Sequence, residues 1–191
     1  MELTIISDSR EFRRNFLKSM RNYSRYYWAT AWATDDPGYV TLNGYHFYLM
    51  DELVKASKNG KICSLICGLY GAGGQPTTST KFIRMMKETP NVHFVIKEGD
   101  GNLDIAMHCK MYLFVNSPKD WCCYVGSANF TRGGFSENFE VMTKIVGSDA
   151  TSNETAFLAD ARQFFDNFFQ NDDIREASEK EIVDYLLGIV Q

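Results

Sequence analysis

Hydrophobic positions recur along the chain with two periods, one typical of strands and one typical of helices. Short β-branched or aromatic runs predict strands at residues 3–6, 26–33, 61–67, 92–96, 105–115, 121–125 and 139–146. Between them, apolar residues return every three or four positions. This spacing predicts a first helix from Phe12 to Tyr23, with Ser7 or Ser9 as its N-cap, and further helices at residues 45–57, 78–88, 157–169 and 182–187.

The alternation of strands and helices predicts an α/β fold. We expect a mixed β-sheet flanked by helices on both faces, an α/β/α sandwich. No internal repeat, low-complexity tract or linker divides the chain, so residues 1–191 are predicted to form a single domain. At this length and with 45% hydrophobic residues, the chain can bury a full core.

The sequence predicts a cytoplasmic protein that does not bind membranes. No apolar run approaches the roughly 20 residues that cross a bilayer, and the first residues carry acids where a secretory leader would be basic. The five cysteines are odd in number and contain no CxxC pair, which indicates reduced thiols and not a disulfide framework.

Charge is distributed unevenly along the chain. The formal net charge is −4, but residues 149–191 hold ten acidic and three basic residues, so residues 1–148 are net +3. On the first predicted helix, basic residues recur every three or four positions, at Arg10, Arg14, Lys18, Arg21 and Arg25. Such a stripe is either an ordinary solvated face or a surface that contacts phosphates.

The common hydrolytic motifs are missing, and one short motif stands out. No lysine follows an acidic residue at i−2, and neither a zinc-binding His/Cys pattern nor GxSxG occurs, so we expect no metal and no cofactor. His108 and Lys110 lie two apart in a predicted strand, which places them on the same face. A neutral imidazole can attack phosphorus while the lysine neutralises the phosphate oxygens. The alternative for His108 is a hydrogen-bonded core histidine.

A second motif, YVGSANFTRGGF at residues 124–135, follows the next strand. Gly126 permits a sharp exit from that strand, and Ser127 and Asn129 carry uncharged polar groups that could stabilise an oxyanion. The alternative is a turn in which Ser127 or Asn129 caps a helix. Glu140 lies at the start of an apolar strand and needs a polar partner; we expect this partner to be His108, whose tautomer the carboxylate would fix.

Together, HxK at residues 108–110 and GSxN at residues 126–129 resemble the phospholipase D superfamily. GSANFTRGGF, followed by Asn138 and Glu140, resembles its nuclease branch, which includes metal-independent restriction endonucleases. The resemblance is close over residues 104–146. The wider superfamily has an aspartate at position 115, where this chain has Val115. The resemblance therefore implies the nuclease form of the site, with Glu140 in the orienting role.

A two-step displacement needs a second histidine to protonate the leaving oxygen, and one chain offers only one HxK. We therefore predict a homodimer in which His108, Lys110 and Asn129 of both protomers meet across a two-fold axis, as the resemblance also implies. The predicted activity is metal-independent cleavage of nucleic acid through a phosphohistidine, with Arg132, Arg14 and Lys18 holding phosphates. DNA is the favoured substrate.

Several alternatives remain open. RNA could replace DNA as the substrate. No target-recognition domain is evident, so we expect cleavage to be weakly selective, or its specificity to come from a partner subunit or from sequence absent from this chain. A phospholipid phosphodiesterase could use Tyr26, Tyr27, Trp28 and Trp32 as an interfacial contact. A non-catalytic nucleic-acid-binding subunit could keep the fold, although the complete set of His108, Lys110, Asn129 and Glu140 argues against that alternative.

Overall fold

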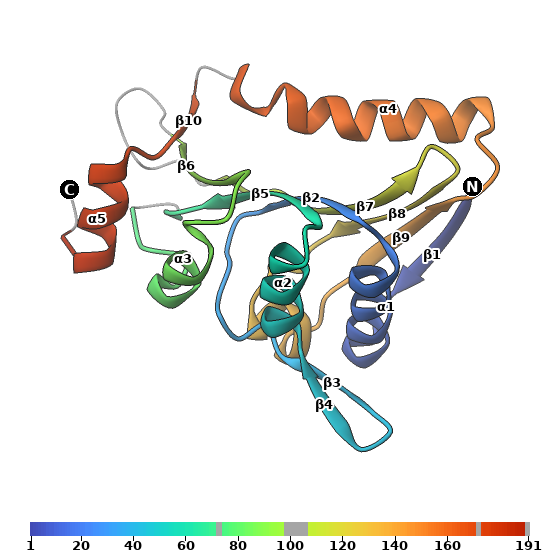
Figure 1. Cartoon of the computed structure of the whole chain (residues 1–191), viewed down its shortest axis with the longest axis horizontal. Coiled ribbons are helices and arrows are strands. Elements are labelled where there is room, and N and C mark those ends of the chain that lie inside the picture. Colours follow the sequence, from blue (N-terminus) through green and yellow to red (C-terminus); the bar gives the residue numbers. More distant parts are fainter. Residues whose placement is uncertain (72–73, 98–106, 171–172, 190–191) are drawn as a thin grey trace.

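A mixed eight-stranded sheet separates two layers of helices in the computed structural model, which describes residues 1–71, 74–97, 107–170 and 173–189 (Figure 1). The predicted fold class is confirmed. The strands, in chain order, are β1 (Glu2–Ile6), β2 (Arg25–Thr30), β5 (Ile62–Gly68), β6 (Val92–Lys97), β7 (Lys110–Ser117), β8 (Asp120–Gly126), β9 (Met142–Gly147) and β10 (Ile174–Glu176). Their order across the sheet is β1-β9-β8-β7-β2-β5-β6-β10. The β2–β5 and β5–β6 pairs are parallel. The other neighbouring pairs of this sheet are antiparallel.

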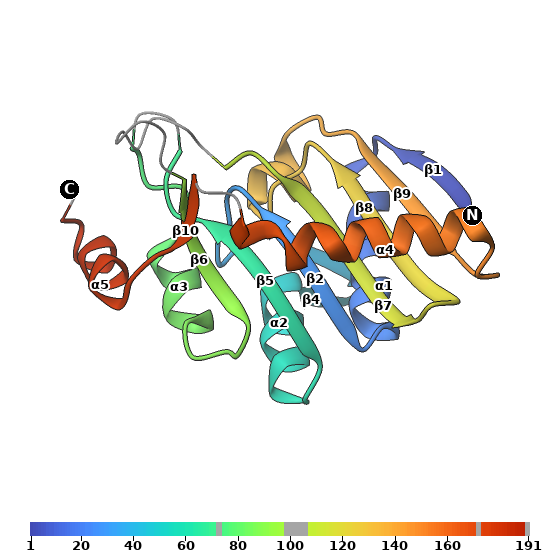
Figure 2. The ribbon, with the colours of Figure 1, turned by 90° about the horizontal axis from the view of Figure 1, so that it is seen from above.

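The two faces of the sheet carry separate apolar cores. Helices α1 (Ser9–Asn22), α2 (Leu49–Lys58) and α3 (Thr80–Met86) cover one face, and α4 (Ser152–Asp166) crosses the other (Figures 1 and 2). On the first face, the ring of Phe16 packs among aromatic side chains from β2, β7 and β8. On the second, Trp121 stacks on Phe157 with ring centroids 5.2 Å apart.

Helix α1 forms where the apolar spacing predicts it. Phe12, Phe16 and Met20 are all buried. The N-cap, however, is Asp8 and not Ser7 or Ser9: the Asp8 carboxylate accepts a hydrogen bond of 2.8 Å from the Glu11 backbone N–H. A carboxylate at this position also interacts favourably with the positive end of the helix dipole.

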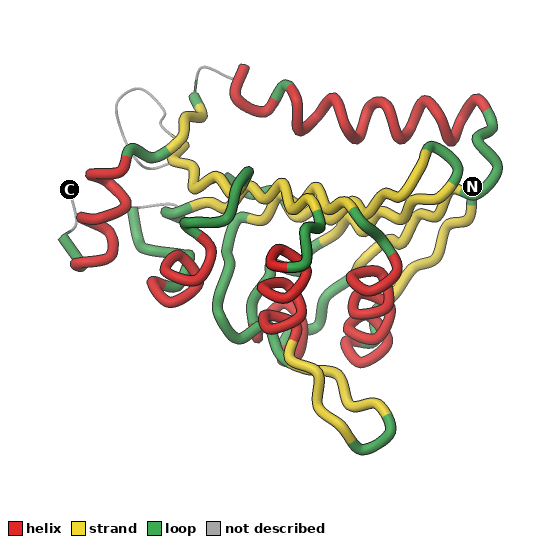
Figure 3. Tube along the Cα trace, in the orientation of Figure 1, coloured by secondary structure: helices red, strands yellow, loops and turns green. Residues whose placement is uncertain are grey.

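The predicted helix at residues 45–57 is wrong in its first part. Tyr45–Tyr48 form strand β4, which pairs with β3 (Tyr39–Leu42) in a hairpin. Helix α2 begins only at Leu49. Asn43 and Gly44 have φ of 50° and 80°. This left-handed pair is the hairpin turn that an Asn-Gly sequence favours, and the turn separates two runs with strand propensity. Figure 3 shows the hairpin projecting from the helical layer.

Two predicted strands begin later than expected. The strand expected at 105–115 begins at Lys110, and its first two residues, 105 and 106, lie outside the described part of the chain. The strand expected at 139–146 begins at Met142. His108 and Glu140 therefore lie in the segments that lead into strands.

The basic stripe predicted on the first helix is interrupted. Arg21 pairs with Glu52 of α2, with Nε to Oε2 at 3.1 Å, and Arg25 lies on β2 because α1 has already ended at Asn22. Arg10, Arg14 and Lys18 remain exposed on the helix. The interpretation of all five residues as one continuous surface is wrong.

The cysteine prediction is confirmed, since all five thiols are free. Burial raises the pKa of Cys63 to about 11 and that of Cys67 to about 12. Within the described residues, no helix combines the length and the apolar character needed to cross a membrane.

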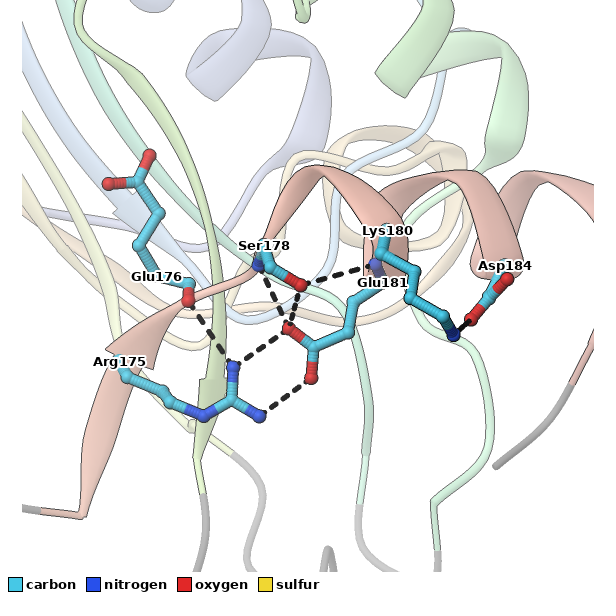
Figure 4. Close-up of polar contacts among 6 residues, drawn as sticks. All are labelled: Arg175, Glu176, Ser178, Lys180, Glu181 and Asp184. Atoms are coloured by element: carbon cyan, nitrogen blue, oxygen red, sulfur yellow. Dashed lines mark hydrogen bonds and ion pairs between the residues drawn. The ribbon is translucent and has the colours of Figure 1, made fainter.

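Polar contacts at the end of the chain hold the last helix, α5 (Glu179–Leu187), against the edge strand β10 (Figure 4). Ser178 and Glu181 form a capping box, and the Arg175 guanidinium donates two hydrogen bonds, of 2.9 and 2.7 Å, to the Glu181 carboxylate. Farther along α5, the Tyr185 hydroxyl donates to the Thr78 carbonyl at 2.5 Å. The helix thereby fixes the loop that follows β5.

These contacts predict pH-dependent stability. The hydrogen bonds from Arg175 and Ser178 lower the pKa of Glu181 to about 2. We expect Glu181→Gln to reduce the free energy of unfolding at pH 7 by about 1–2 kcal/mol, the range for losing a cap and a charged hydrogen bond. Because the folded pKa is depressed, the difference from wild type should be full above the ordinary glutamate pKa of about 4.3 and shrink as the pH falls towards 2.

Urea denaturation of both proteins at pH 7, 5 and 3 would measure this difference. Glu179→Gln is the matched control, because it removes a neighbouring exposed carboxylate and leaves the capping box and the ion pair in place. A difference for Glu181→Gln that stayed constant from pH 7 to pH 3 would contradict the prediction.

Candidate active site

The residues of both sequence motifs come together at one edge of the sheet. Lys110 begins β7 directly opposite Thr30, the last residue of β2, and Gly126 ends the neighbouring strand β8. The chain then passes through Ser127 and Asn129 into the one-turn π-helix η1 (Gly133–Glu137), and returns to β9. The site is thus formed by segments that enter and leave adjacent strands.

His108 and Lys110 contact each other as predicted, although His108 lies just before the strand. Lys110 Nζ is 2.7 Å from His108 Nε2. The ammonium group has only protons to offer, so Nε2 acts as the acceptor and the ring proton of a neutral imidazole lies on Nδ1. His108 is exposed and Lys110 is buried. The Nε2 lone pair of the exposed imidazole is thus engaged by Lys110, and it becomes available for attack when a bound anion takes over the ammonium group.

Burial affects both neighbouring residues of this strand. It lowers the pKa of Lys110, while Cys109 and Glu140 oppose that shift. Cys109 lies on the other face of the sheet, against the core beneath α4, and burial raises the pKa of its thiol to about 11. Cys109 is therefore protonated at neutral pH, and His108 is the better nucleophile here.

Glu140 does not contact His108, so the predicted pairing of these two residues is wrong in this structure. The Ser127 hydroxyl donates to Glu140 Oε2 and accepts a 3.0 Å hydrogen bond from the Val141 N–H. Glu140 Oε1 accepts from the Asn138 side chain at 3.4 Å. Because Ser127 already donates its proton to the carboxylate, it also does not offer an oxyanion-stabilising donor as predicted. Glu140 and Ser127 instead tie the two ends of the 127–140 segment together.

Asn129 does have a free donor. Its Oδ1 accepts a hydrogen bond from the Trp32 backbone N–H at 3.2 Å and lies 3.4 Å from the Thr30 hydroxyl, whose proton goes to the Trp32 carbonyl at 2.9 Å. No described residue pairs with the Asn129 NH₂ group, which is therefore available to a ligand. Neither Asn129 nor Ser127 caps a helix, because η1 has Arg132 at its N-cap position. The capping alternative is therefore wrong for both residues.

Thr30, which the sequence analysis did not identify, lies beside Asn129 and helps to position it. It is only 2% exposed. Its hydroxyl accepts from the Phe130 backbone N–H at 3.2 Å and lies 3.4 Å from the Tyr112 hydroxyl. Tyr112 in turn has its hydroxyl 2.9 Å from the Ala128 carbonyl. A lone polar residue at the end of an otherwise apolar strand was the only signal for this role.

Gly126 occupies a position that excludes a larger side chain. A Cβ atom there would lie 2.2 Å from the Val141 carbonyl oxygen, and one on Gly134 would lie 2.3 Å from the Asn129 carbonyl oxygen. Both glycines thus allow backbone segments of the 127–140 region to pack closely. Gly126 has a role in backbone geometry, as predicted for the strand exit.

Arg14 and Arg132 meet in a groove of about 670 Å³, which Arg10 and Arg13 also line. None of the motif residues at 108, 110, 127, 129 and 140 lines this groove. Arg132 pairs with Asp36 at 3.1 Å and lies 3.8 Å from Glu137. Lys18 lies outside the groove, in a neighbouring hollow shared with Arg10 and Arg14. Arg14 thus lines one pocket with Arg132 and another with Lys18, and neither pocket holds all three of the cations predicted to bind phosphates.

Exposed apolar side chains border the site. Phe139 is 84% exposed and adjoins Glu140, and Trp32, which donates its N–H to Asn129, is 43% exposed. Val125 and Val141 are also exposed beside Gly126 and Glu140. In the described ranges, no three His, Cys, Asp or Glu side chains are grouped so that they could hold a metal ion.

Comparison with known proteins identifies a protein family that matches this chain. Residues 39–166 match the family model described as "Cardiolipin synthase, PLD-like domain". A search of curated proteins found no match. Among solved structures, the chain is similar to NucT from Helicobacter pylori (15% identity, TM-score 0.60, 92% of this chain and 98% of that one).

Two further structures share the fold. Nuc from Salmonella typhimurium, a phospholipase D family member, has 16% identity and a TM-score of 0.56, over 93% of this chain and 100% of that one. Phosphatidylserine synthase from Haemophilus influenzae Rd KW20 has 10% identity and a TM-score of 0.58, over 96% of this chain and 41% of that one. At such low identities, these similarities show a common fold.

Proposed function

The chain belongs to the PLD-like domain family of the phospholipase D superfamily, and from this premise we propose that it is a metal-independent phosphodiesterase that cleaves nucleic acid, with DNA as the favoured substrate. The observation that carries the proposal is the contact of 2.7 Å between His108 Nε2 and Lys110 Nζ. A neutral imidazole held beside a buried cation suits nucleophilic attack on a phosphodiester.

The proposed reaction has two displacements at phosphorus. The substrate phosphate takes over the Lys110 ammonium, and Nε2 of His108 forms a bond to phosphorus while the bond to the leaving oxygen breaks. A second His108, which enters the reaction as imidazolium, gives its Nε2 proton to that oxygen and becomes neutral. It then takes a proton from water, whose oxygen displaces the first imidazole, and so returns to imidazolium. The Lys110 ammonium and the Asn129 NH₂ group stabilise the charge on the non-bridging oxygens throughout.

The second histidine comes from a second protomer in this proposal. Each chain would contribute His108, Lys110 and Asn129 to a site on a two-fold axis. The apolar residues that border the site, Trp32, Val125, Phe139 and Val141, support this arrangement, because a partner would cover them. If it is right, specific activity falls when the protein is diluted below its dimer dissociation constant, and a fully active monomer would exclude it.

Nucleic acid is proposed over the other substrates on grounds of charge. Residues 1–148 are net basic, and Arg14 and Arg132 line the same groove. A phospholipid substrate loses two of the four residues of its proposed interfacial contact, because Tyr26 and Trp28 are buried in the core, although Trp32 is exposed. RNA remains the second candidate substrate.

Cleavage in the presence of a chelator tests the proposal. We expect labelled single- or double-stranded DNA to be cut at an undiminished rate in excess EDTA, because a lysine and an asparagine here supply the charge stabilisation that many nucleases take from Mg²⁺. The control is a Mg²⁺-dependent nuclease in the same buffer, which EDTA must silence. Cleavage that EDTA abolishes and added Mg²⁺ restores would refute the metal-independent mechanism.

A further inference from the structure

The β3–β4 hairpin carries aromatic side chains that are largely exposed to solvent. Tyr45 is 72% exposed, Tyr48 49% and Tyr39 41%. The Tyr39 ring lies 5.5 Å from the Tyr48 ring and 4.6 Å from the His46 ring, centroid to centroid. Figure 1 shows the hairpin extending well beyond the helices on its face of the sheet. The rings of Tyr39, His46 and Tyr48 thus form a cluster on one face of the hairpin, and Tyr45 lies on the opposite face.

The hairpin is firmly attached to the body of the molecule. Val40 is buried, and the Arg21 guanidinium lies over the Phe47 ring, 4.2 Å from its centroid. The Leu49 N–H donates to the Gly38 carbonyl at 3.1 Å, which closes the base of the hairpin. Because one face of the hairpin is anchored, the exposed rings are held in fixed positions and would lose little conformational entropy on binding a ligand.

The same hairpin forms one wall of the arginine-lined groove. Tyr39 lines the groove together with Arg10, Arg13, Arg14 and Arg132. Arg13 is held in place by its 2.6 Å hydrogen bond to the Phe135 carbonyl. The only acidic residue on the lining is Glu137, so the groove has a net positive charge.

Arg10 and Arg14 are the cations of the groove that are free to bind an anion. Both are exposed, and neither forms an ion pair with a residue in the described ranges. Arg132, by contrast, is shared between Asp36 and Glu137. A ligand with several phosphates would therefore contact Arg10 and Arg14 first.

We propose that the groove and the β3–β4 hairpin bind single-stranded nucleic acid, with the arginines holding phosphates and Tyr39 and Tyr48 stacking on unpaired bases. Fixed rings beside a basic groove are the combination that single strands need, because stacking requires base faces that a duplex keeps covered. This proposal deepens the proposed function and rests on it, since it names the form of nucleic acid.

The groove is continuous in the chain with the candidate active site. Its wall includes Arg132, Ser136 and Glu137, which lie between Asn129 and Glu140 in the segment closed by the Ser127–Glu140 contact. A nucleic-acid strand bound in the groove would therefore contact the same 127–140 segment that carries Asn129.

Binding without cleavage separates this proposal from the catalytic one. We would measure the affinity of a fluorescently labelled oligo(dT) and of a duplex of equal length for proteins that all carry His108→Ala. In this background, Tyr39→Ala combined with Tyr48→Ala should weaken oligo(dT) binding by a factor between about five and about a hundred, the loss expected for one stacked base. Duplex affinity should change less than twofold, and the salt dependence of oligo(dT) binding should stay the same.

The arginines should give a different signature. Arg10→Gln combined with Arg14→Gln should weaken binding of both forms and lower the slope of log affinity against log salt by roughly 0.7 per lost contact for oligo(dT). Lys55→Gln with Lys58→Gln, two exposed cations of α2, is the matched charge control. Phe164→Ala on α4 is the matched aromatic control, and Tyr39→Phe with Tyr48→Phe, which keeps both rings, should retain the wild-type oligo(dT) affinity.

The outcomes are decisive in both directions. Loss of oligo(dT) affinity in the alanine pair, with rescue by phenylalanine and an unchanged melting temperature, supports the proposal whether or not the wild type cleaves DNA. Wild-type affinity in the tyrosine variants overturns it, as does an equal loss for oligo(dT) and duplex. If the protein that retains His108 cleaves DNA and the tyrosine variants bind as the wild type does, the catalytic proposal stands and this one is refuted.

Discussion

Replacing His108 by alanine is expected to reduce kcat for DNA cleavage by on the order of 10⁴- to 10⁶-fold, the range found when a catalytic nucleophile or its partner is removed from other hydrolases. The imidazole is the group that bonds to phosphorus in the first step, and in a shared site it is also the acid that protonates the leaving oxygen. Neither role passes to a neighbour, because burial keeps the Cys109 thiol protonated with a pKa of about 11.

Single-turnover cleavage of end-labelled DNA in EDTA, at matched protein concentration, measures this loss. His93→Ala is the control, because His93 lies on β6 and its side chain contacts Glu176 at the far edge of the sheet. Quenching the wild-type reaction in denaturant should trap a covalent protein–DNA adduct, and the His108 variant should form none. A variant that cuts within tenfold of the wild-type rate would show that another group is the nucleophile.

Replacing Lys110 by methionine is expected to cost about 10²- to 10³-fold in kcat, which is typical of removing one donor that stabilises charge in the transition state. The methionine keeps the apolar stem of the buried lysine, so the loss should fall on catalysis and not on folding. Lys119→Met, in the turn between β7 and β8, is the control because Lys119 is exposed. Near-normal kcat in Lys110→Met would exclude the role assigned to the ammonium group.

The buried position of Lys110 also predicts the alkaline side of the pH profile. Burial lowers its pKa, and only the protonated amine can neutralise phosphate. The rate constant kcat/KM, which reports groups of the free enzyme, should therefore fall at a pH below that at which an exposed lysine titrates. Lys110→Arg should lack this fall, because arginine stays charged throughout the range. A descending limb identical in the wild type and Lys110→Arg would assign the limb to another group.

The elements that local spacing defines were predictable. The apolar positions of α1 repeat with the period of a helix, and Phe12, Phe16 and Met20 lie buried as expected. The alternation of strands and helices was enough to predict the α/β/α arrangement. His108 and Lys110 also meet as expected, because two residues separated by one are close neighbours on any extended segment.

Local spacing failed where a short signal competed with a longer one. Apolar residues between Tyr45 and Ser57 have helical spacing, yet the Asn43-Gly44 turn folds the first of them into β4. The turn prevails because both of its residues adopt left-handed conformations that glycine and asparagine tolerate at little cost, and the new strand then pairs with β3.

The sequence alone thus determined most of the helices and strands of the sheet, the fold class and the two motifs, since each depends on residues close together in the chain. The tertiary structure decided which distant side chains meet. It paired Glu140 with Ser127, placed Thr30 beside Asn129, and joined Arg10 and Arg14 of α1 with Arg132 in one groove. Such contacts depend on the packing of α1, the hairpin and the 127–140 segment against one sheet, and no local period encodes that packing.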